Sequence, residues 1–156
     1  MIQRVQTLYM TGAIVAFIAM FFFPLAHFNN YDHGLYVLSA LGVKYMIEPP
    51  IFVNFWLTFP MCMMVIISLL LTGTAIFLYR KRSFQIWLVN ISFLLNVILI
   101  LLIFLYYTNH FEGIAHSKAN YQFGIAFPLV SLFCQILASR AIRKDEALVK
   151  SSDRLR

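Results

Sequence analysis

Histidine is the residue type in this chain best suited to chemistry, and its copies lie at the ends of long apolar runs or between them. They are His27, His33, His110 and His116. With Asp32, Glu48 and Glu112 they offer the nitrogen and oxygen donors that bind zinc and other divalent metals. No pair has a metal-ligand spacing such as H-x-x-x-H on a helix. The sequence therefore predicts no metal site, and these histidines are only weak candidates for one.

Other catalytic signatures are missing from the sequence. It contains no G-x-S-x-G, no H-E-x-x-H, no C-x-x-C and no G-x-x-x-x-G-K-[ST] phosphate loop. Cys62 and Cys134 fall inside apolar runs at different expected depths, whereas a disulfide needs Cα atoms within about 7 Å. We therefore expect two unpaired thiols, no cofactor and no enzyme activity.

The composition indicates that lipid is the solvent of most of the chain. Hydrophobic residues make up 62% of the 156 residues and charged residues 12%, against about 45–50% and about 25% in soluble domains. Four apolar runs cover residues 8–27, 52–79, 84–107 and 121–139. About 20 helical residues cross the ~30 Å hydrocarbon core. The sequence therefore predicts an all-α membrane protein, with residues 1–139 forming a four-transmembrane-helix bundle.

The basic residues predict an orientation. Ten of the twelve fall on one side of this topology, and Lys44 and Lys118 fall on the other. Because segments rich in lysine and arginine stay in the cytoplasm, we expect both termini and the loop between helices two and three there. The net charge of +6 then belongs to the cytoplasmic face. No surface of interleaved basic and aromatic residues is apparent, so we expect no nucleic-acid partner.

The first external segment, residues 28–51, is predicted to hold a small β-hairpin at residues 35–46. β-prone stretches flank a Ser-Ala-Leu-Gly sequence that ends with Gly42 at the turn. An unstructured loop is the alternative. The second external segment, residues 108–120, is predicted to be a short polar connector.

Prolines recur in the predicted helices. Pro24, Pro60 and Pro128 lie toward the outer halves of helices one, two and four. Each removes a backbone donor and tends to kink its helix. Kinks at a similar depth would splay the helices into an outward-facing cavity beneath the hairpin. A simple adjustment of helix packing is the alternative.

Polar side chains inside the predicted helices are hydroxyls and amides, with no Asp, Glu, Lys or Arg, which argues against proton-coupled transport and ion conduction. They include Ser68, Thr72, Thr74, Asn90, Ser92, Asn96 and Gln135. Ser92 and Asn96 are four residues apart and share a helix face, whereas Asn90 does not align with them. We expect these groups to hydrogen-bond between helices. Gly12 and Ala16 form a small-xxx-small pair suited to close helix approach.

Residues 140–156 are predicted to form a basic helical tail in the cytoplasm. The stretch has no Gly or Pro, and Ala141, Leu148 and Leu155 recur at seven-residue spacing beside Ile142 and Val149. We interpret this narrow apolar stripe as a docking surface for an inner-membrane or cytoplasmic protein, with a solvated anchoring tail as the alternative. The candidate partner-docking residues are Arg140, Arg143, Lys144, Leu148, Val149 and Leu155.

Two ends of the chain and two internal strings carry a resemblance. Residues 1–9 (MIQRVQTLY) and 140–156 (RAIRKDEALVKSSDRLR), with FPL at 23–25 and SALG at 39–42, resemble an uncharacterised family of small four-helix bacterial membrane proteins known as a domain of unknown function. The resemblance implies a bacterial inner-membrane location and a four-helix fold, and it implies no activity. The layout is also similar, as an architectural analogy only, to claudin-like tetraspan proteins.

These observations favour a non-catalytic inner-membrane protein that serves as an accessory or scaffold subunit of a larger membrane complex. Its expected partners are the lipid bilayer and proteins that bind the tail. The alternative is a small-molecule binding subunit that holds a quinone, haem, lipid or metal in the outward-facing cavity.

The expected topology is testable with reporter fusions. Fusions after Lys44 and Lys118 should report the periplasm, and fusions after Arg82 and Arg156 the cytoplasm, because basic segments are retained inside. Paired alkaline phosphatase and fluorescent-protein fusions measure both outcomes. A periplasmic signal after Arg82 would overturn the four-span topology.

Overall fold

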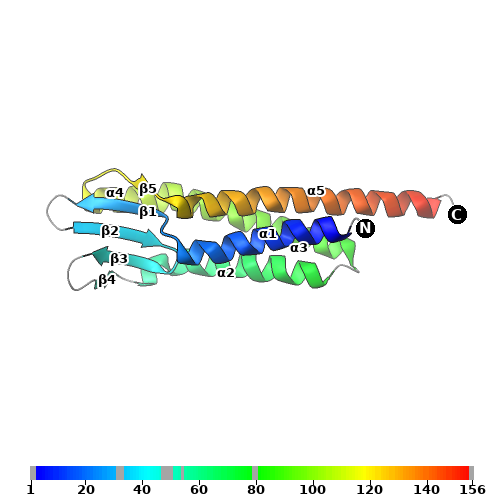
Figure 1. The fold of residues 1–156 in the computed structure, drawn as a ribbon, viewed down its shortest axis with the longest axis horizontal. Coiled ribbons are helices and arrows are strands. Elements are labelled where there is room, and N and C mark those ends of the chain that lie inside the picture. The colour runs from blue at the N-terminus through cyan, green and yellow to red at the C-terminus, as the bar shows by residue number, and fades with distance from the viewer. Residues whose placement is uncertain (1–2, 31–33, 47–50, 54, 79–80, 155–156) are drawn as a thin grey trace.

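Four long helices run side by side and carry a small β-sheet at one end (Figure 1). The computed structural model describes residues 3–30, 34–46, 51–53, 55–78 and 81–154. The long helices are α1 (Gln3–Phe22), α2 (Phe55–Phe77), α3 (Arg82–Leu101) and α5 (Ala126–Arg154). α3 continues through a π-helical segment, η1 (Leu102–Tyr107), into α4 (Thr108–Ala115). A 3-10 turn, η2 (Phe123–Ile125), leads into α5.

The helices have the number, length and apolar composition that the sequence predicts. Within the described residues, four helical stretches are long and apolar enough to cross a membrane: Val5–Phe22, Trp56–Phe77, Ser83–Ala115 and Phe123–Leu148. The shortest has 18 residues, and at ~1.5 Å per residue it extends about 27 Å. Helices suit such sequences because all their backbone hydrogen bonds are made within the segment.

The predicted hairpin is confirmed and is part of a larger sheet. β2 (Gly34–Ser39) pairs with β3 (Gly42–Met46) from Leu35 opposite Met46 to Ser39 opposite Gly42. The Ser39 hydroxyl donates to the Gly42 carbonyl across the turn at 2.7 Å. The antiparallel sheet has five strands in the order β4-β3-β2-β1-β5. The added strands are β1 (Ala26–Asn30), β4 (Ile51–Val53) and β5 (Asn120–Tyr121).

Three predicted helix boundaries were wrong where strands replace apolar helix. The first helix ends at Phe22, so residues 23–27 leave it and β1 begins at Ala26. Residues 51–53 form β4 before α2, and Tyr121 belongs to β5, with α5 starting at Ala126. Hydropathy cannot separate these cases, because a short buried strand is as apolar as a helix end.

The prediction that residues 108–120 form a short polar connector was also wrong, because this segment contains regular structure. Its first part is α4, which extends the third helix beyond the predicted run of residues 84–107 to Ala115. Its last residue, Asn120, opens β5. Hydropathy marks where the sequence becomes polar, but a helix can continue beyond that point when its side chains pack against another part of the fold. Here Phe111 of α4 is buried and its ring lies 5.6 Å from that of Phe28 on β1.

Of the two alternatives for the prolines, an adjustment of packing fits the described helices better than splaying does. Pro24 lies outside any helix, and Pro128 lies in the first turn of α5, where backbone donors have few intrahelical partners. Pro60 alone lies within α2 beyond its first turn. Below the hairpin the space is filled by the main core cluster, which includes Phe17, Met20, Leu25, Phe28, Leu38, Val43, Met61, Leu99, Ile103, Tyr107 and Phe111.

Strand alternation gives the sheet one face toward this core. Leu38 and Val43 are cross-strand neighbours and both are buried. Near the sheet end of the helices, the buried Tyr107 hydroxyl donates to the Leu57 carbonyl at 2.7 Å. This hydrogen bond joins η1 to the start of α2. A second cluster at the opposite end of the bundle contains Met10, Ala75, Leu88, Val89, Ala138 and Ile142.

A hydrogen-bonded junction fixes the sheet to the helices. The Leu25 amide donates to the Leu38 carbonyl at 2.8 Å, and the Leu25 carbonyl accepts from the Gln122 amide at 3.0 Å. The Gly124 amide then donates to the Pro24 carbonyl at 3.0 Å. A Cβ atom at Gly124 would clash with the Pro24 carbonyl and with the Phe23 oxygen, which are backbone atoms. Glycine is therefore required where the two chain segments cross.

Replacing Gly124 with alanine should destabilise the protein, because the junction must shift to accept a Cβ atom. We expect a loss of ~1–3 kcal/mol and a lower thermal unfolding temperature in detergent. Gly113→Ala is the matched control, since nothing lies within 4 Å of a Cβ at this exposed α4 position. The control should be neutral or stabilising by ~0.5–1 kcal/mol through helix propensity. Equal unfolding temperatures for the two variants would contradict the steric requirement.

Candidate functional site

Six hydroxyl and amide side chains meet inside the bundle, where α3 lies between α2 and α5. All six are at most 1% exposed. They are Ser68, Thr72, Ser92, Asn96, Ser131 and Gln135. An unpaired polar group in an apolar interior costs free energy. The contribution of this cluster to stability therefore depends on how completely its members hydrogen-bond to one another.

Asn96 and Ser92 of α3 connect the three helices. The Asn96 amide nitrogen donates to the Ser131 hydroxyl at 2.7 Å and to the Gln135 side-chain oxygen at 3.2 Å, both on α5. The Gln135 amide nitrogen donates to the Ser92 hydroxyl at 2.7 Å. On the other side, the hydroxyls of Ser92 and Thr72 are 2.9 Å apart. One chain of hydrogen bonds therefore runs from α5 through α3 to α2.

The chemistry of this polar cluster is that of helix association. Its members are neutral and carry no group that titrates near pH 7. Within the described residues, Asn96 Oδ1 and the Ser68 hydroxyl have no hydrogen-bond partner. The Ser68 carbonyl accepts from both Thr72 and Ser92, at 2.8 and 3.1 Å. The cluster thus joins α2, α3 and α5 through hydrogen bonds between neutral side chains.

The sequence identified most of this cluster. The shared face of Ser92 and Asn96 is confirmed, and Asn90 lies apart on the exposed surface, where its side-chain oxygen accepts from the Ser139 hydroxyl at 3.2 Å. Ser131 was missed, although it precedes Gln135 by four residues and shares its face. Thr74 is not a member, because it is exposed and bonds its own helix at Leu71.

Close packing of α1 against α5 also agrees with the sequence. A Cβ at Gly12 would lie 3.3 Å from the Cys134 sulfur, so the small residue allows this approach. Ala13 and Ala16 are buried on the same helix. Cys134 and Cys62 are both unpaired thiols, as expected.

The three described histidines are not gathered into one site. His27 lies on β1, the exposed His110 stacks on Tyr106 with ring centroids 5.9 Å apart, and His116 ends α4 with a left-handed φ of 51°. His33, with Asp32 and Glu48, lies outside the described residues. Among those that are described, no three His, Cys, Asp or Glu side chains could hold a metal ion. Glu112 instead accepts from the Ala119 amide at 2.9 Å.

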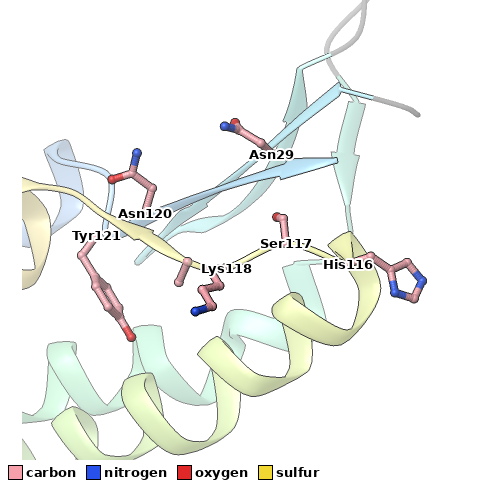
Figure 2. Close-up of a pocket in the computed structure, with 7 residues that line it drawn as sticks. Asn29, His116, Ser117, Lys118, Asn120 and Tyr121 are labelled. Carbon is pink, nitrogen blue, oxygen red and sulfur yellow. The ribbon is translucent and has the colours of Figure 1, made fainter. Parts of the chain in front are cut away.

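A polar hollow of about 830 Å³ lies between β1 and the segment that joins α4 to β5. Figure 2 shows its lining side chains spread along the strand and the loop, with His116 directed away from the others. They are Asn29, His116, Ser117, Lys118, Ala119, Asn120 and Tyr121. Because these groups do not converge on one point, we assign no ligand to this hollow.

A second hollow, of about 370 Å³, lies on the sheet face turned away from α4. Its walls are mostly apolar, with Phe21, Leu35, Val37 and Met46 among them. His27 and Lys44 supply its titratable groups within the described residues. The sequence suggested a cavity between splayed helices beneath the hairpin. This hollow lies instead on the open side of the sheet.

The predicted tail is the continuation of α5, and the helix runs unbroken to Arg154. Its first turns still pack on the bundle, since Ile142 is fully buried and the Gln6 amide donates to the Ala141 carbonyl at 3.3 Å. Ile142 is therefore not part of a free apolar stripe. Leu148 is 48% exposed, and Arg140, Arg143 and Lys144 are exposed as well. The Val149 side chain and Leu155 lie outside the described part.

The polar cluster should show energetic coupling between α3 and α5. Asn96→Ala removes the donor to Ser131 and Gln135, and we expect a loss of ~1–2 kcal/mol. A double-mutant cycle with Gln135→Ala should give a coupling of ~0.5–2 kcal/mol, measured by denaturant unfolding in mixed micelles. Thr74→Val is the control and should change stability little. Additive losses for Asn96→Ala and Gln135→Ala would show that the 3.2 Å contact carries no coupling.

Comparison with known proteins adds a family. Residues 2–155 match the model of a family described as a domain of unknown function, DUF4293. No curated protein and no solved structure matches the chain. The match covers almost the whole sequence and confirms the resemblance to an uncharacterised family. The chain belongs to the DUF4293 family.

Proposed function

We propose that this protein is a non-catalytic, multi-pass protein of the bacterial inner membrane that acts as an accessory or scaffold subunit of a larger membrane complex. In this proposal the four helices cross the bilayer, the sheet lies in the periplasm, and both termini are cytoplasmic. The observation that carries the proposal is the end of α5, which projects past the start of α1 as a helix with an exposed apolar residue (Figure 1).

The outer surface of the helices supports a membrane location. Large apolar side chains face outward along the helices, among them Leu70 at 58% exposure, Leu94 at 58% and Phe133 at 61%. Soluble monomers rarely expose contiguous apolar surface on this scale. Transfer of such side chains from water to hydrocarbon is favourable by roughly 25 cal/mol per Å².

The distribution of charge supports the orientation. Lys44 and Lys118 lie in or beside the sheet, on β3 and before β5. The other described basic residues lie at the opposite end of the helices: Arg4, Lys81, Arg82, Arg140, Arg143, Lys144, Lys150 and Arg154. A cytoplasmic location for this basic end follows from the positive-inside rule.

The interior of the bundle supports a structural role. The six buried residues of the polar cluster bond between helices, and no ionisable carboxylate or amine of the described residues belongs to this cluster. The buried Asp145 lies beyond it, near the basic end of α5. Transporters and proton pumps use such ionisable groups within the membrane. A scaffold needs rigid helices that hold an external sheet and a cytoplasmic helix in a fixed relation, and the polar cluster supplies this rigidity.

A small-molecule binding subunit is a second candidate, favoured by the 370 Å³ hollow on the open sheet face. Its apolar walls with His27 and Lys44 suit an amphiphilic ligand such as a quinone or lipid better than a bare metal ion. Absorption spectra and metal analysis of the purified protein discriminate the two candidates. A bound chromophore or stoichiometric metal would favour this second function.

The docking role of the α5 end is testable with serine substitutions. Replacing Leu148, Val149 and Leu155 with serine keeps every charge, so the protein should stay in the membrane and lose its partner. A photo-crosslinking amino acid introduced at Lys144 measures the partner as a discrete crosslinked band, which should fall at least about ten-fold for the loss of a buried apolar anchor.

Two controls make this result specific. Ala147→Ser changes an exposed neighbour on the same helix and should leave the crosslinked band intact. Neutralising Lys150, Arg154 and Arg156 should weaken the band less than the serine substitutions do. If the serine variant keeps the band and the neutralised variant loses it, the α5 end acts through charge and the docking proposal is wrong.

A further inference from the structure

A groove of about 230 Å³ between α3 and α5 combines basic, neutral polar and apolar groups at the cytoplasmic end of the bundle. It is lined by Asn90, Phe93, Gln135, Ile136, Ser139, Arg140 and Arg143. We propose that this groove is a binding site for one anionic phospholipid, with its phosphate held at Arg140 and Arg143. This inference rests on the proposed membrane location and is independent of any docking partner.

The two arginines form the charged part of the site. They are three residues apart on one helix, so they share a face, and both are exposed. Within the described residues neither guanidinium has a carboxylate partner, and Asp145 is buried on a different face of α5. Guanidinium groups bind phosphate oxygens through paired, charge-assisted hydrogen bonds. Two such groups at one groove therefore favour a phosphate over a neutral headgroup.

Asn90 and Ser139 form the neutral part of the site. The Ser139 hydroxyl donates to the Asn90 side-chain oxygen at 3.2 Å, which joins the two walls of the groove. The Asn90 amide nitrogen makes no hydrogen bond to another described residue and remains a donor at the groove. Phosphate oxygens and glycerol hydroxyls of a lipid headgroup are acceptors for such a donor.

Apolar side chains continue the groove toward the sheet. Phe93 and Ile136 line it directly. One and two turns further along α5, Phe133 and Leu129 are exposed at helical spacing from Ile136, and Leu101 is exposed on α3. A free phosphate ion would gain nothing from this surface, whereas acyl chains would cover it. The order from basic to apolar therefore matches a lipid standing along the bilayer normal.

The depth of the arginines agrees with this order. From Ala126 at the start of α5 to Arg143 the helix advances about 25 Å at ~1.5 Å per residue. The hydrocarbon core is ~30 Å thick. With the start of α5 near the outer boundary, the backbone of Arg143 lies ~5 Å and that of Arg140 ~9 Å short of the inner boundary. Long arginine side chains extend from such positions toward the inner headgroups, where anionic lipids are found.

Lipid binding to the purified full-length chain tests the site without any partner. Native mass spectrometry from mixed micelles measures the first bound lipid for phosphatidylglycerol and for phosphatidylcholine with the same chains. The wild-type protein should bind phosphatidylglycerol about ten-fold more tightly, because two charge-assisted contacts favour it. The Arg140→Gln/Arg143→Gln variant should lose this preference.

The matched control is Lys81→Gln/Lys144→Gln, which removes the same charge from two exposed residues that do not line the groove. It should keep the preference within about two-fold, since general electrostatic attraction falls only slightly with two distant charges. Excess inorganic phosphate should not displace the lipid. Thermal unfolding of each variant checks that the fold is retained.

Three results would overturn the proposal. Equal affinity of the wild-type protein for the two lipids would show that the groove does not select an anionic headgroup, whatever the variants do. An equal loss in both double variants would show diffuse attraction by the whole basic end. Displacement by inorganic phosphate would show a site for a free anion. The crosslinked partner and the fusion topology are separate readouts, so they distinguish failure of this site from failure of the proposed function.

Discussion

The structure depends on the junction where the chain leaves α1, enters the sheet and later returns to α5. Three backbone hydrogen bonds join Pro24 and Leu25 to Leu38, Gln122 and Gly124. The backbone donors and acceptors of this junction lie beside the apolar core, so each one needs a hydrogen-bond partner. Once these bonds are made, β1 is placed between β2 and β5, and the ends of α1 and α5 are held together. The sheet is therefore a continuation of the bundle rather than a separate appendage.

A second constraint operates further along the helices. If lipid surrounds the bundle, apolar side chains gain little from leaving it for one another, so helix association needs close packing and interhelical hydrogen bonds. Gly12 allows α1 to approach Cys134 on α5, and Asn96 links α3 to α5 through Ser131 and Gln135. These contacts stabilise helix association, which burial of apolar surface stabilises in a soluble bundle. They also explain why polar residues appear in otherwise apolar helices.

The two ends of the molecule offer different chemistry. At the sheet end, the two hollows carry scattered polar groups or apolar walls, with few charges. At the opposite end, basic residues gather on α5, and part of that helix extends beyond the bundle. The proposed lipid groove and the proposed docking end lie on the same helix. Arg140 and Arg143, which the sequence placed among the docking candidates, line the groove, whereas Leu148 is the exposed apolar residue of the docking end. A bound lipid would fix the base of the helix from which the docking end projects.

The sequence by itself determined the features that depend on composition or on neighbours in the chain. Four apolar helical stretches, the hairpin around Ser39 and Gly42, the shared face of Ser92 and Asn96, and the family follow from local pattern. The tertiary structure decided the features that need a distant partner. Residues 26–30 and 51–53 become strands because β2 and β3 offer free edges to them, although their hydropathy resembles that of a helix end. Ser131, the burial of Ile142 and the requirement for Gly124 likewise depend on segments far away in sequence. Hydrogen bonding across a sheet and packing between helices are pairwise contacts, so one segment alone cannot specify them.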